Sequence, residues 1–241
     1  MPPVQLIVFD LAGTTVEDDN AVAGSLHQAA AEAGLDVPLL EFQQSIGTNK
    51  IRLYEYLIAR SRGRALRFED LERLGLSEYH EEALRMFERY TVIMLDHYRR
   101  QVRAIPGAEE VFRWCKSQGI KVATDTGFHR DINTAIQEGL GWLERGLTDL
   151  AVDVEHAGGI GRPAPFMIFY AMQQLGVQSV HQVIKIGDTP ADLLSGRNAG
   201  CRGNIAVLSG ANSAEILGAY AHTHMLPSVR ELPALILREF A

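Results

Sequence analysis

The chain begins with one short apolar segment, and its second half alternates between apolar segments of two kinds. Residues 4–9 are rich in Val, Ile and Phe and are followed by Asp10, which predicts a buried strand that ends in an acid. From about residue 107 onwards, short β-branched segments alternate with segments of helical spacing. This alternation predicts an α/β fold, with a parallel sheet that carries helices on both faces. We predict further strands at 120–124, 150–152, 183–186 and 204–208, and helices at 108–117, 131–140, 165–175 and 190–199.

The segment between the first strand and this alternating half has a different pattern. Residues 22–33, 51–58 and 71–98 are rich in Ala, Leu, Glu or Arg with helical spacing, and no strand pattern bounded by turns interrupts them. We therefore predict an all-helical cap domain, residues 18–100. It is inserted into a discontinuous α/β core domain made of residues 1–17 and 101–241.

Composition narrows the classes of function. The 241 residues include 23 Lys and Arg against 30 Asp and Glu, and a net charge of −7 argues against a nucleic-acid-binding protein. No apolar run reaches the roughly 18 residues that span a bilayer, and the first residues lack the basic segment of a signal peptide. The two cysteines, Cys115 and Cys201, suit a reducing compartment. We expect a cytoplasmic protein that binds neither nucleic acid nor membrane.

Polar side chains gather where the predicted strands end. Carboxyl ends of parallel strands meet at one edge of a sheet, which is where ligands bind. Carboxylates there suit Mg²⁺, and a cation with hydroxyls and backbone N–H groups suits phosphoryl transfer, with an Asp as nucleophile. Helix capping alone could explain any one Asp, but four elements in this order favour a site. The side chains are Asp10, Thr124, Asp125, Thr126, Arg162, Asp188 and Asp192.

These segments resemble the four motifs of the haloacid dehalogenase superfamily. The matching stretches are residues 10–15, the strand end with Thr124 and Thr126, Arg162, and residues 187–192. The resemblance implies a Rossmann-like core with an inserted cap, dependence on Mg²⁺, Asp10 as the nucleophile, and Arg162 paired with the nucleophile and the phosphate. It also implies a metal site made by Asp10, the backbone carbonyl of Ala12, Asp188 and Asp192.

Ala12 is where this chain departs from most phosphatases of the superfamily. They carry a second Asp there, which protonates the leaving group and later activates water, whereas an Ala side chain can do neither. The phosphonoacetaldehyde hydrolase family also has Ala at this position. Residues 46–51 resemble the segment that bears the Schiff-base lysine of that family, which implies this role for Lys50. Residues 126–130, 161–163 and 196–200 also resemble it. The resemblance implies that Gly47, Gly127, Phe128 and either Thr124 or Thr126 bind the substrate.

The proposed chemistry explains why such residues would occur together. Breaking a P–C bond expels a carbanion, which needs an electron sink rather than a general acid. An imine between a lysine and an aldehyde is such a sink, and the lysine must be neutral to form it.

Three positions depart from the phosphonoacetaldehyde hydrolase pattern: that family has a Cys near Asn20, a His at Leu53 and a Tyr at Phe128.

Three functions remain open from the sequence. The first is a Mg²⁺-dependent hydrolase that cleaves the P–C bond of phosphonoacetaldehyde or a related small phosphonate through Lys50. The second is a phosphate-ester phosphatase of the same superfamily, in which Lys50 only binds substrate. The third is a non-catalytic phosphometabolite-binding protein. Ala12 taken alone favours this function, whereas the presence of Asp10, Arg162 and the later aspartates argues against it. The resemblance also implies a homodimer through the cap.

Overall fold

The computed structural model describes residues 3–68 and 77–240, and the chain divides into two compact units. The first, which we call the core unit, comprises Met1–Asp18 and Gln101–Ala241. The second, the helical unit, is Asp19–Arg100. The sequence predicted junctions after residues 17 and 100, and the two units divide after residues 18 and 100.

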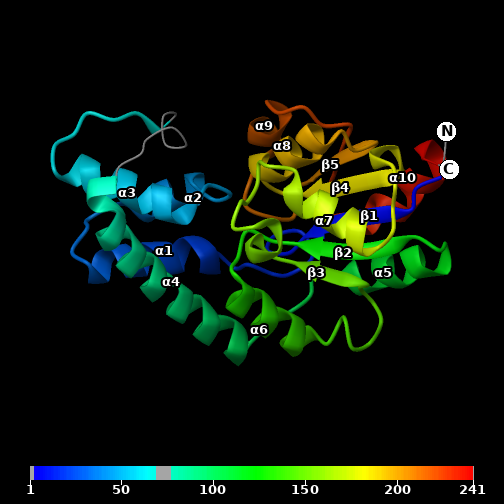
Figure 1. Ribbon diagram of the computed structural model, residues 1–241, viewed down its shortest axis with the longest axis horizontal. Coiled ribbons are helices and arrows are strands. Elements are labelled where there is room, and N and C mark those ends of the chain that lie inside the picture. The colour runs from blue at the N-terminus through cyan, green and yellow to red at the C-terminus, as the bar shows by residue number, and fades with distance from the viewer. Residues whose placement is uncertain (1–2, 69–76, 241) are drawn as a thin grey trace. The chain divides into compact units, whose positions relative to one another are not determined.

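The core unit contains a parallel sheet of six strands in the order β3-β2-β1-β4-β5-β6 (Figure 1). All neighbouring strands run parallel, so the predicted α/β class is confirmed. The sequence did not predict β6, because its segment His-Met-Leu contains no β-branched or aromatic residue typical of strands. The strands are β1 (Leu6–Asp10), β2 (Lys121–Asp125), β3 (Leu150–Val152), β4 (Val183–Gly187), β5 (Gly203–Val207) and β6 (His224–Leu226).

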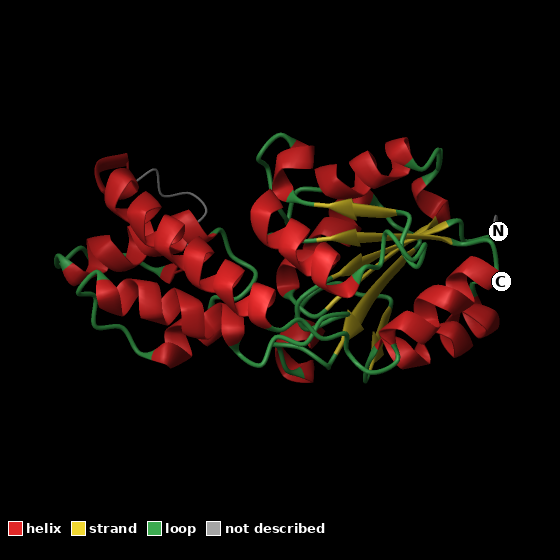
Figure 2. Ribbon diagram, turned by 90° about the horizontal axis from the view of Figure 1, so that it is seen from below, coloured by secondary structure: helices red, strands yellow, loops and turns green. Residues whose placement is uncertain are grey.

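Helices cover both faces of this sheet (Figure 2). On one face, the Phe9 ring of β1 packs edge-on against Phe112, with ring centroids 5.1 Å apart. On the other, Val8 lies in a cluster with Met167 and Ile168. Both faces of β1 are therefore buried, which explains its unbroken apolar sequence. The helices are α5 (Ala108–Ser117), α6 (Arg130–Leu140), α7 (Phe166–Gln174), α8 (Pro190–Ala199), α9 (Ala214–Gly218) and α10 (Leu232–Glu239), with short 3₁₀ turns η3 (Val154–Ala157), η4 (Val180–Gln182) and η5 (Val229–Glu231).

The start of α8 follows from local sequence. Thr189 and Asp192 form a reciprocal capping box, Pro190 occupies the first turn, and Gly200 ends the helix with φ of 78°. This helix carries Asp192 directly to the carboxyl edge of β4, so its capping signals also position a site residue.

The strand order reverses between β1 and β4, and this switch point is where open α/β sheets bind ligands. The register places Asp10 beside Asp125 and Val8 beside Lys185. Side chains in register, or two residues apart, lie on one face of a sheet. Asp10, Asp125 and Lys185 therefore share the face on which Val8 packs.

The regular elements among the described residues of the helical unit are all helices. Buried side chains recur at helical spacing along the longest helix, at Met86, Tyr90 and Met94. The helix that carries Tyr54 is linked to the helix that carries Leu26, because the Tyr54 hydroxyl donates to the Leu26 carbonyl at 3.0 Å. Residues 71–76 of the predicted helix 71–98 lie outside the described residues. The helices are α1 (Ala21–Glu32), α2 (Leu39–Gln44), α3 (Lys50–Ser61), η2 (Ser77–Tyr79) and α4 (His80–Arg100).

None of the helices in the described part of the chain is long and apolar enough to span a membrane.

Candidate active site

Asp10 and Arg162 meet at the carboxyl end of β1. The Arg162 guanidinium donates to Asp10 Oδ1 at 2.8 Å, although the two residues lie 152 positions apart in the sequence. Both side chains are largely buried, with 10% and 5% of their surfaces exposed. Burial, reinforced by the nearby charge of Asp192, raises the pKa of Asp10 to about 6. The predicted nucleophile and its predicted cationic partner are thus in contact.

Asp192 is the carboxylate that ties this pair to the rest of the site. It accepts hydrogen bonds from Arg162 and from the Thr189 hydroxyl, and Lys185 Nζ lies 2.8 Å away. Burial opposes ionisation of Asp192, but Arg162 and Lys185 outweigh that cost and hold its pKa at about 2. Asp192 is therefore an ionised partner of the two cations.

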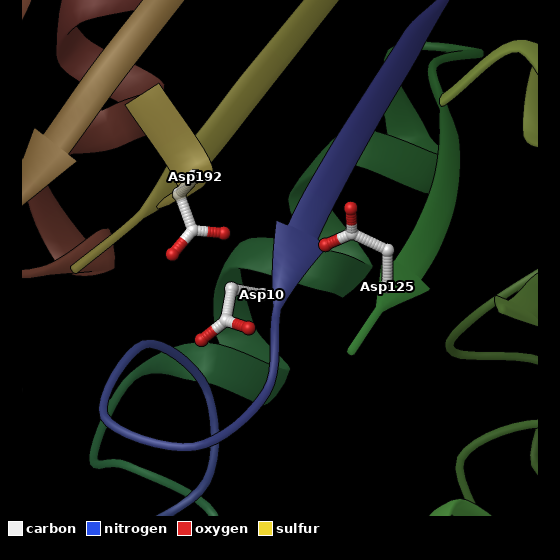
Figure 3. Close-up of side chains that lie close together, drawn as sticks. All are labelled: Asp10, Asp125 and Asp192. Atoms are coloured by element: carbon white, nitrogen blue, oxygen red, sulfur yellow. The ribbon is translucent and has the colours of Figure 1, made fainter. Parts of the chain in front are cut away.

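Lys185 and Asp125 form an ion pair beside Asp10, and the sequence pattern did not predict this pair. Both side chains are fully buried, and Lys185 Nζ donates to Asp125 Oδ1 at 2.6 Å. Figure 3 shows the carboxylates of Asp10, Asp125 and Asp192 gathered around the end of β1. The available signal was a lysine inside the apolar strand segment 183–186, because a buried lysine requires an acidic partner.

Asp188 follows β4 and contacts the loop after Asp10. Its two carboxylate oxygens accept from the Thr14 hydroxyl at 3.1 Å and from the backbone N–H of Ala211 at 2.8 Å. Gly13 allows this close approach, because a Cβ there would lie 2.5 Å from Asp188 Oδ2. Burial and the charge of Asp10 raise the pKa of Asp188 well above its usual value.

The two threonines near the end of β2 face different surroundings. Thr124 is fully buried and accepts from the Gln137 side chain at 3.4 Å, whereas neighbouring side chains such as Asp125 point to the other face. Thr126 begins the loop after the strand, and its hydroxyl accepts from the N–H of Phe128 at 3.1 Å. Gly127 lies close to Arg162, since a Cβ on it would be 3.6 Å from the guanidinium. The structure thus brings the Thr126–Gly127 loop, and not Thr124, towards Arg162.

The remaining predicted residues lie in the first loop and in the helical unit. Ala12 lies in the turn after β1 and forms an isolated bridge with Val16. Gly47 has φ of 96°, a conformation that favours glycine. Lys50 is the first residue of α3, after the Asn49 cap, and its Nζ lies 5.8 Å from the centre of the Tyr90 ring.

The acidic residues fit a divalent cation. With all groups ionised, Asp10, Asp125, Asp188 and Asp192 carry four negative charges against two positive charges on Arg162 and Lys185. One oxygen each of Asp10, Asp125 and Asp192 lies within 4.8 Å of the others, but both oxygens of Asp192 already accept from protein donors. Both oxygens of Asp188 also accept from protein donors, so hydrogen bonding does not separate Asp188 from Asp192. The carboxylates of Asp10, Asp188 and Asp192 and the carbonyl of Ala12 are all oxygen ligands of the kind that Mg²⁺ prefers.

Fold and site define an α/β protein with an aspartate centre at the switch point of a parallel sheet, an arrangement suited to phosphoryl transfer. The family model of haloacid dehalogenase-like hydrolases matches residues 4–200. The chain belongs to this family, and it is a hydrolase.

Relatives and solved structures resemble the chain over almost its whole length. A phosphonoacetaldehyde hydrolase of Lactiplantibacillus plantarum is 24% identical, covering 97% of this chain and 95% of its own. A phosphonoacetaldehyde hydrolase-like protein from Oleispira antarctica has a TM-score of 0.75 at 22% identity, covering 98% and 92% of the two chains. A structure described as a "predicted phosphoglycolate phosphatase" from Haemophilus somnus has a TM-score of 0.75 at 18% identity, covering 98% and 99%. The two structures show a shared fold.

Proposed function

We propose that this hydrolase uses Mg²⁺ to cleave the P–C bond of phosphonoacetaldehyde or a closely related small phosphonate. The observation that carries the proposal is the residue pair Asp10 and Ala12. A buried carboxylate beside Arg162 can attack phosphorus, yet the position that supplies the proton to an ester leaving group holds a methyl group. The curated relative named phosphonoacetaldehyde hydrolase, which matches 97% of the chain, supports the same substrate class.

Asp10 is the nucleophile in this proposal. Its carboxylate attacks phosphorus as the P–C bond breaks, which leaves an acyl phosphate on Asp10, and water then releases inorganic phosphate. Arg162, held by Asp10 and Asp192, donates hydrogen bonds to the phosphoryl oxygens. Bound Mg²⁺ would supply positive charge for those oxygens and would favour the ionised form of Asp10.

Lys50 activates the carbon that leaves. Its neutral amine condenses with the substrate aldehyde and releases water, and the resulting imine takes up a proton from solvent to give an iminium. The electron pair of the broken P–C bond then enters the iminium, so the carbon leaves as an enamine. Protonation and hydrolysis of this enamine release acetaldehyde and regenerate the amine. No proton from position 12 is required.

The other three lysines of the sequence lie in the core unit. Lys116 pairs with Asp149, and Lys121 donates to the Leu175 carbonyl. Lys185 is fully buried; burial alone would lower its pKa, but Asp125 and Asp192 outweigh burial and raise it. A lysine kept charged in this way is a poor nucleophile towards an aldehyde. Lys50, the remaining lysine of the sequence, lies at the start of α3 in the helical unit.

Substrate contacts follow from the loop positions described above. We assign the phosphate contact to Thr126 and the N–H of Gly127 rather than to Thr124, because the Thr126–Gly127 loop lies beside Arg162. Gly47 and Phe128 are assigned to substrate binding on the resemblance of their segments to the phosphonoacetaldehyde hydrolase family.

A phosphate-ester phosphatase of the same family is the second candidate. Leu53 favours it, since the phosphonoacetaldehyde hydrolase family has at this position a His that helps imine formation. Leu53 is buried, with 1% of its surface exposed, and cannot take over that role. In this case Lys50 only binds the substrate.

Borohydride trapping separates the two candidates. Protein incubated with phosphonoacetaldehyde and sodium borohydride is digested and mapped by mass spectrometry. The proposal predicts a reduced adduct on Lys50, none in Lys50→Arg, and an unchanged adduct in the matched control Lys116→Arg. Turnover of phosphonoacetaldehyde by Lys50→Ala at the wild-type rate would sink the imine mechanism. Phosphate release from phosphoglycolate without any Lys50 adduct would favour the phosphatase.

The resemblance further implies a homodimer through the helical unit. Leu84 and Val92 on α4 are exposed apolar side chains, with 36% and 54% of their surfaces accessible. Light scattering on wild type and on Val92→Glu tests this assignment, which predicts a dimer for the first and a monomer for the second.

A further inference from the structure

The buried pair of Lys185 and Asp125 lies beside the proposed nucleophile, with Asp125 paired in register with Asp10. Lys185 pairs in register with Val8, and Val8 precedes Asp10 by two residues. The Nζ of Lys185 lies 2.6 Å from Asp125 and 2.8 Å from Asp192. α8 packs directly over Lys185, because a Cβ on Gly196 would lie 2.9 Å from the Cβ of Lys185. The cation is therefore sealed into the fold and cannot reach a substrate.

Asp125 is a charged residue at a fully buried position of the sheet, where an apolar side chain would be usual. Its side chain has no exposed surface, and its Oδ2 has no hydrogen-bond partner among the described residues. A buried carboxylate with one unpaired oxygen is costly. Arg162 lies 3.9 Å from Asp125 Oδ1, beyond hydrogen-bond distance. The charge of Asp125 is thus held close to both site cations while its side chain touches no solvent.

Without Asp125, the two site cations would face fewer carboxylates. Arg162 and Lys185 both contact Asp192, and Arg162 also holds Asp10. We call the groups of Asp10, Asp125, Asp188, Asp192, Arg162 and Lys185 the Asp10 centre. Because Asp125 compensates the charge of Lys185, this centre has a formal charge of −2 when Asp10, Asp188 and Asp192 are ionised. A charge of −2 matches one divalent cation.

We propose that Asp125, acting through Lys185, is a positioning residue that sets the charge of the Asp10 centre. It thereby strengthens binding of Mg²⁺ and limits binding of the phosphate product. This inference rests on the proposed phosphoryl site at Asp10, but it concerns binding and is independent of which substrate is cleaved.

Calorimetry on Asp125→Asn tests the assignment. MgCl₂ is titrated into metal-free protein, and inorganic phosphate is titrated at saturating Mg²⁺. Removing one buried negative charge is expected to raise the Kd for Mg²⁺ about tenfold and to lower the Kd for phosphate severalfold. Asp125→Asn/Lys185→Met restores the formal charge of −2, so both constants are expected within about twofold of wild type.

Glu239→Gln is the matched control, because it removes one negative charge from an exposed pair with His224 at the start of β6. Both constants should stay unchanged in it. Weakening of both ligands in Asp125→Asn, with a lower melting temperature, would show a structural role and overturn the proposal. Unchanged constants in Asp125→Asn, or a double variant that resembles Asp125→Asn, would also overturn it. A wild type that binds both ligands and cleaves no phosphonate would refute the proposed function alone.

Discussion

The buried carboxylate of Asp10 is predicted to destabilise the metal-free fold. Burial and Asp192 raise its pKa from 3.8 to about 6, so the folded chain binds this proton more tightly than the unfolded chain. Stability conferred by the neutral form is present at low pH and is lost as the pH rises from about 4 to above 6. Each pKa unit corresponds to about 1.4 kcal/mol, so ionised Asp10 costs about 2 to 3 kcal/mol at pH 8.

Asp10→Asn keeps the shape of the side chain and removes this cost. In EDTA at pH 8, urea unfolding should show the variant to be about 2 to 3 kcal/mol more stable than wild type, with a melting temperature roughly 5 to 10 °C higher. The advantage should shrink towards zero at pH 4. Asp96→Asn, which removes an exposed carboxylate paired with Arg100, should stay within about 0.5 kcal/mol of wild type. An Asp10→Asn protein that is no more stable than wild type at pH 8, or whose advantage is the same at pH 4, would refute the reasoning.

Four further predictions concern two glycines, the carboxylate of Glu109 and the metal site. Gly187→Ala should lower activity at least tenfold and stability by about 1 to 3 kcal/mol, because the added Cβ would lie 2.2 Å from Asp192 Cγ. Gly24→Ala, in a helix with no atom within 4 Å of the added Cβ, should instead raise stability by up to about 1 kcal/mol. Glu109, whose pKa Arg145 holds at about 2 through a hydrogen bond, contributes stability above pH 4.5 that is lost as the pH falls towards 2. Melting curves of Glu109→Gln should therefore depend less on pH in that range, and equal acid sensitivity would contradict this. Chelation with EDTA should abolish turnover and MgCl₂ should restore it, whereas full activity in EDTA would exclude the assigned metal site.

Local signals explain how much of the fold could be predicted. Helix α5 lies at the predicted residues 108–117, between Pro106 and Gly119, and the apolar segment that ends at Asp10 forms the central strand. Three elements were missed. Helices α2 and α9 have six and five residues, too few for a periodic pattern, and β6 has no β-branched residue.

The site could be predicted only where its residues follow strand ends or match a family motif. The contact of Asp10 with Arg162 was implied by the resemblance to the haloacid dehalogenase motifs, because Arg162 lies in the loop before α7 and not at a strand end. The pairing of Lys185 with Asp125 was not, since it depends on which strands are neighbours and in which register. The separation of Thr124 from the site likewise depends on the face to which each residue of β2 points.

Product analysis with phosphonoacetaldehyde tests directly whether this hydrolase cleaves a P–C bond through Asp10. Wild-type protein with MgCl₂ is incubated with the aldehyde, and inorganic phosphate and acetaldehyde are measured together. Both products should form in equal amounts with wild type, and neither should form with Asp10→Asn. Release of phosphate from phosphoglycolate under the same conditions, with neither product formed from phosphonoacetaldehyde, would contradict this cleavage.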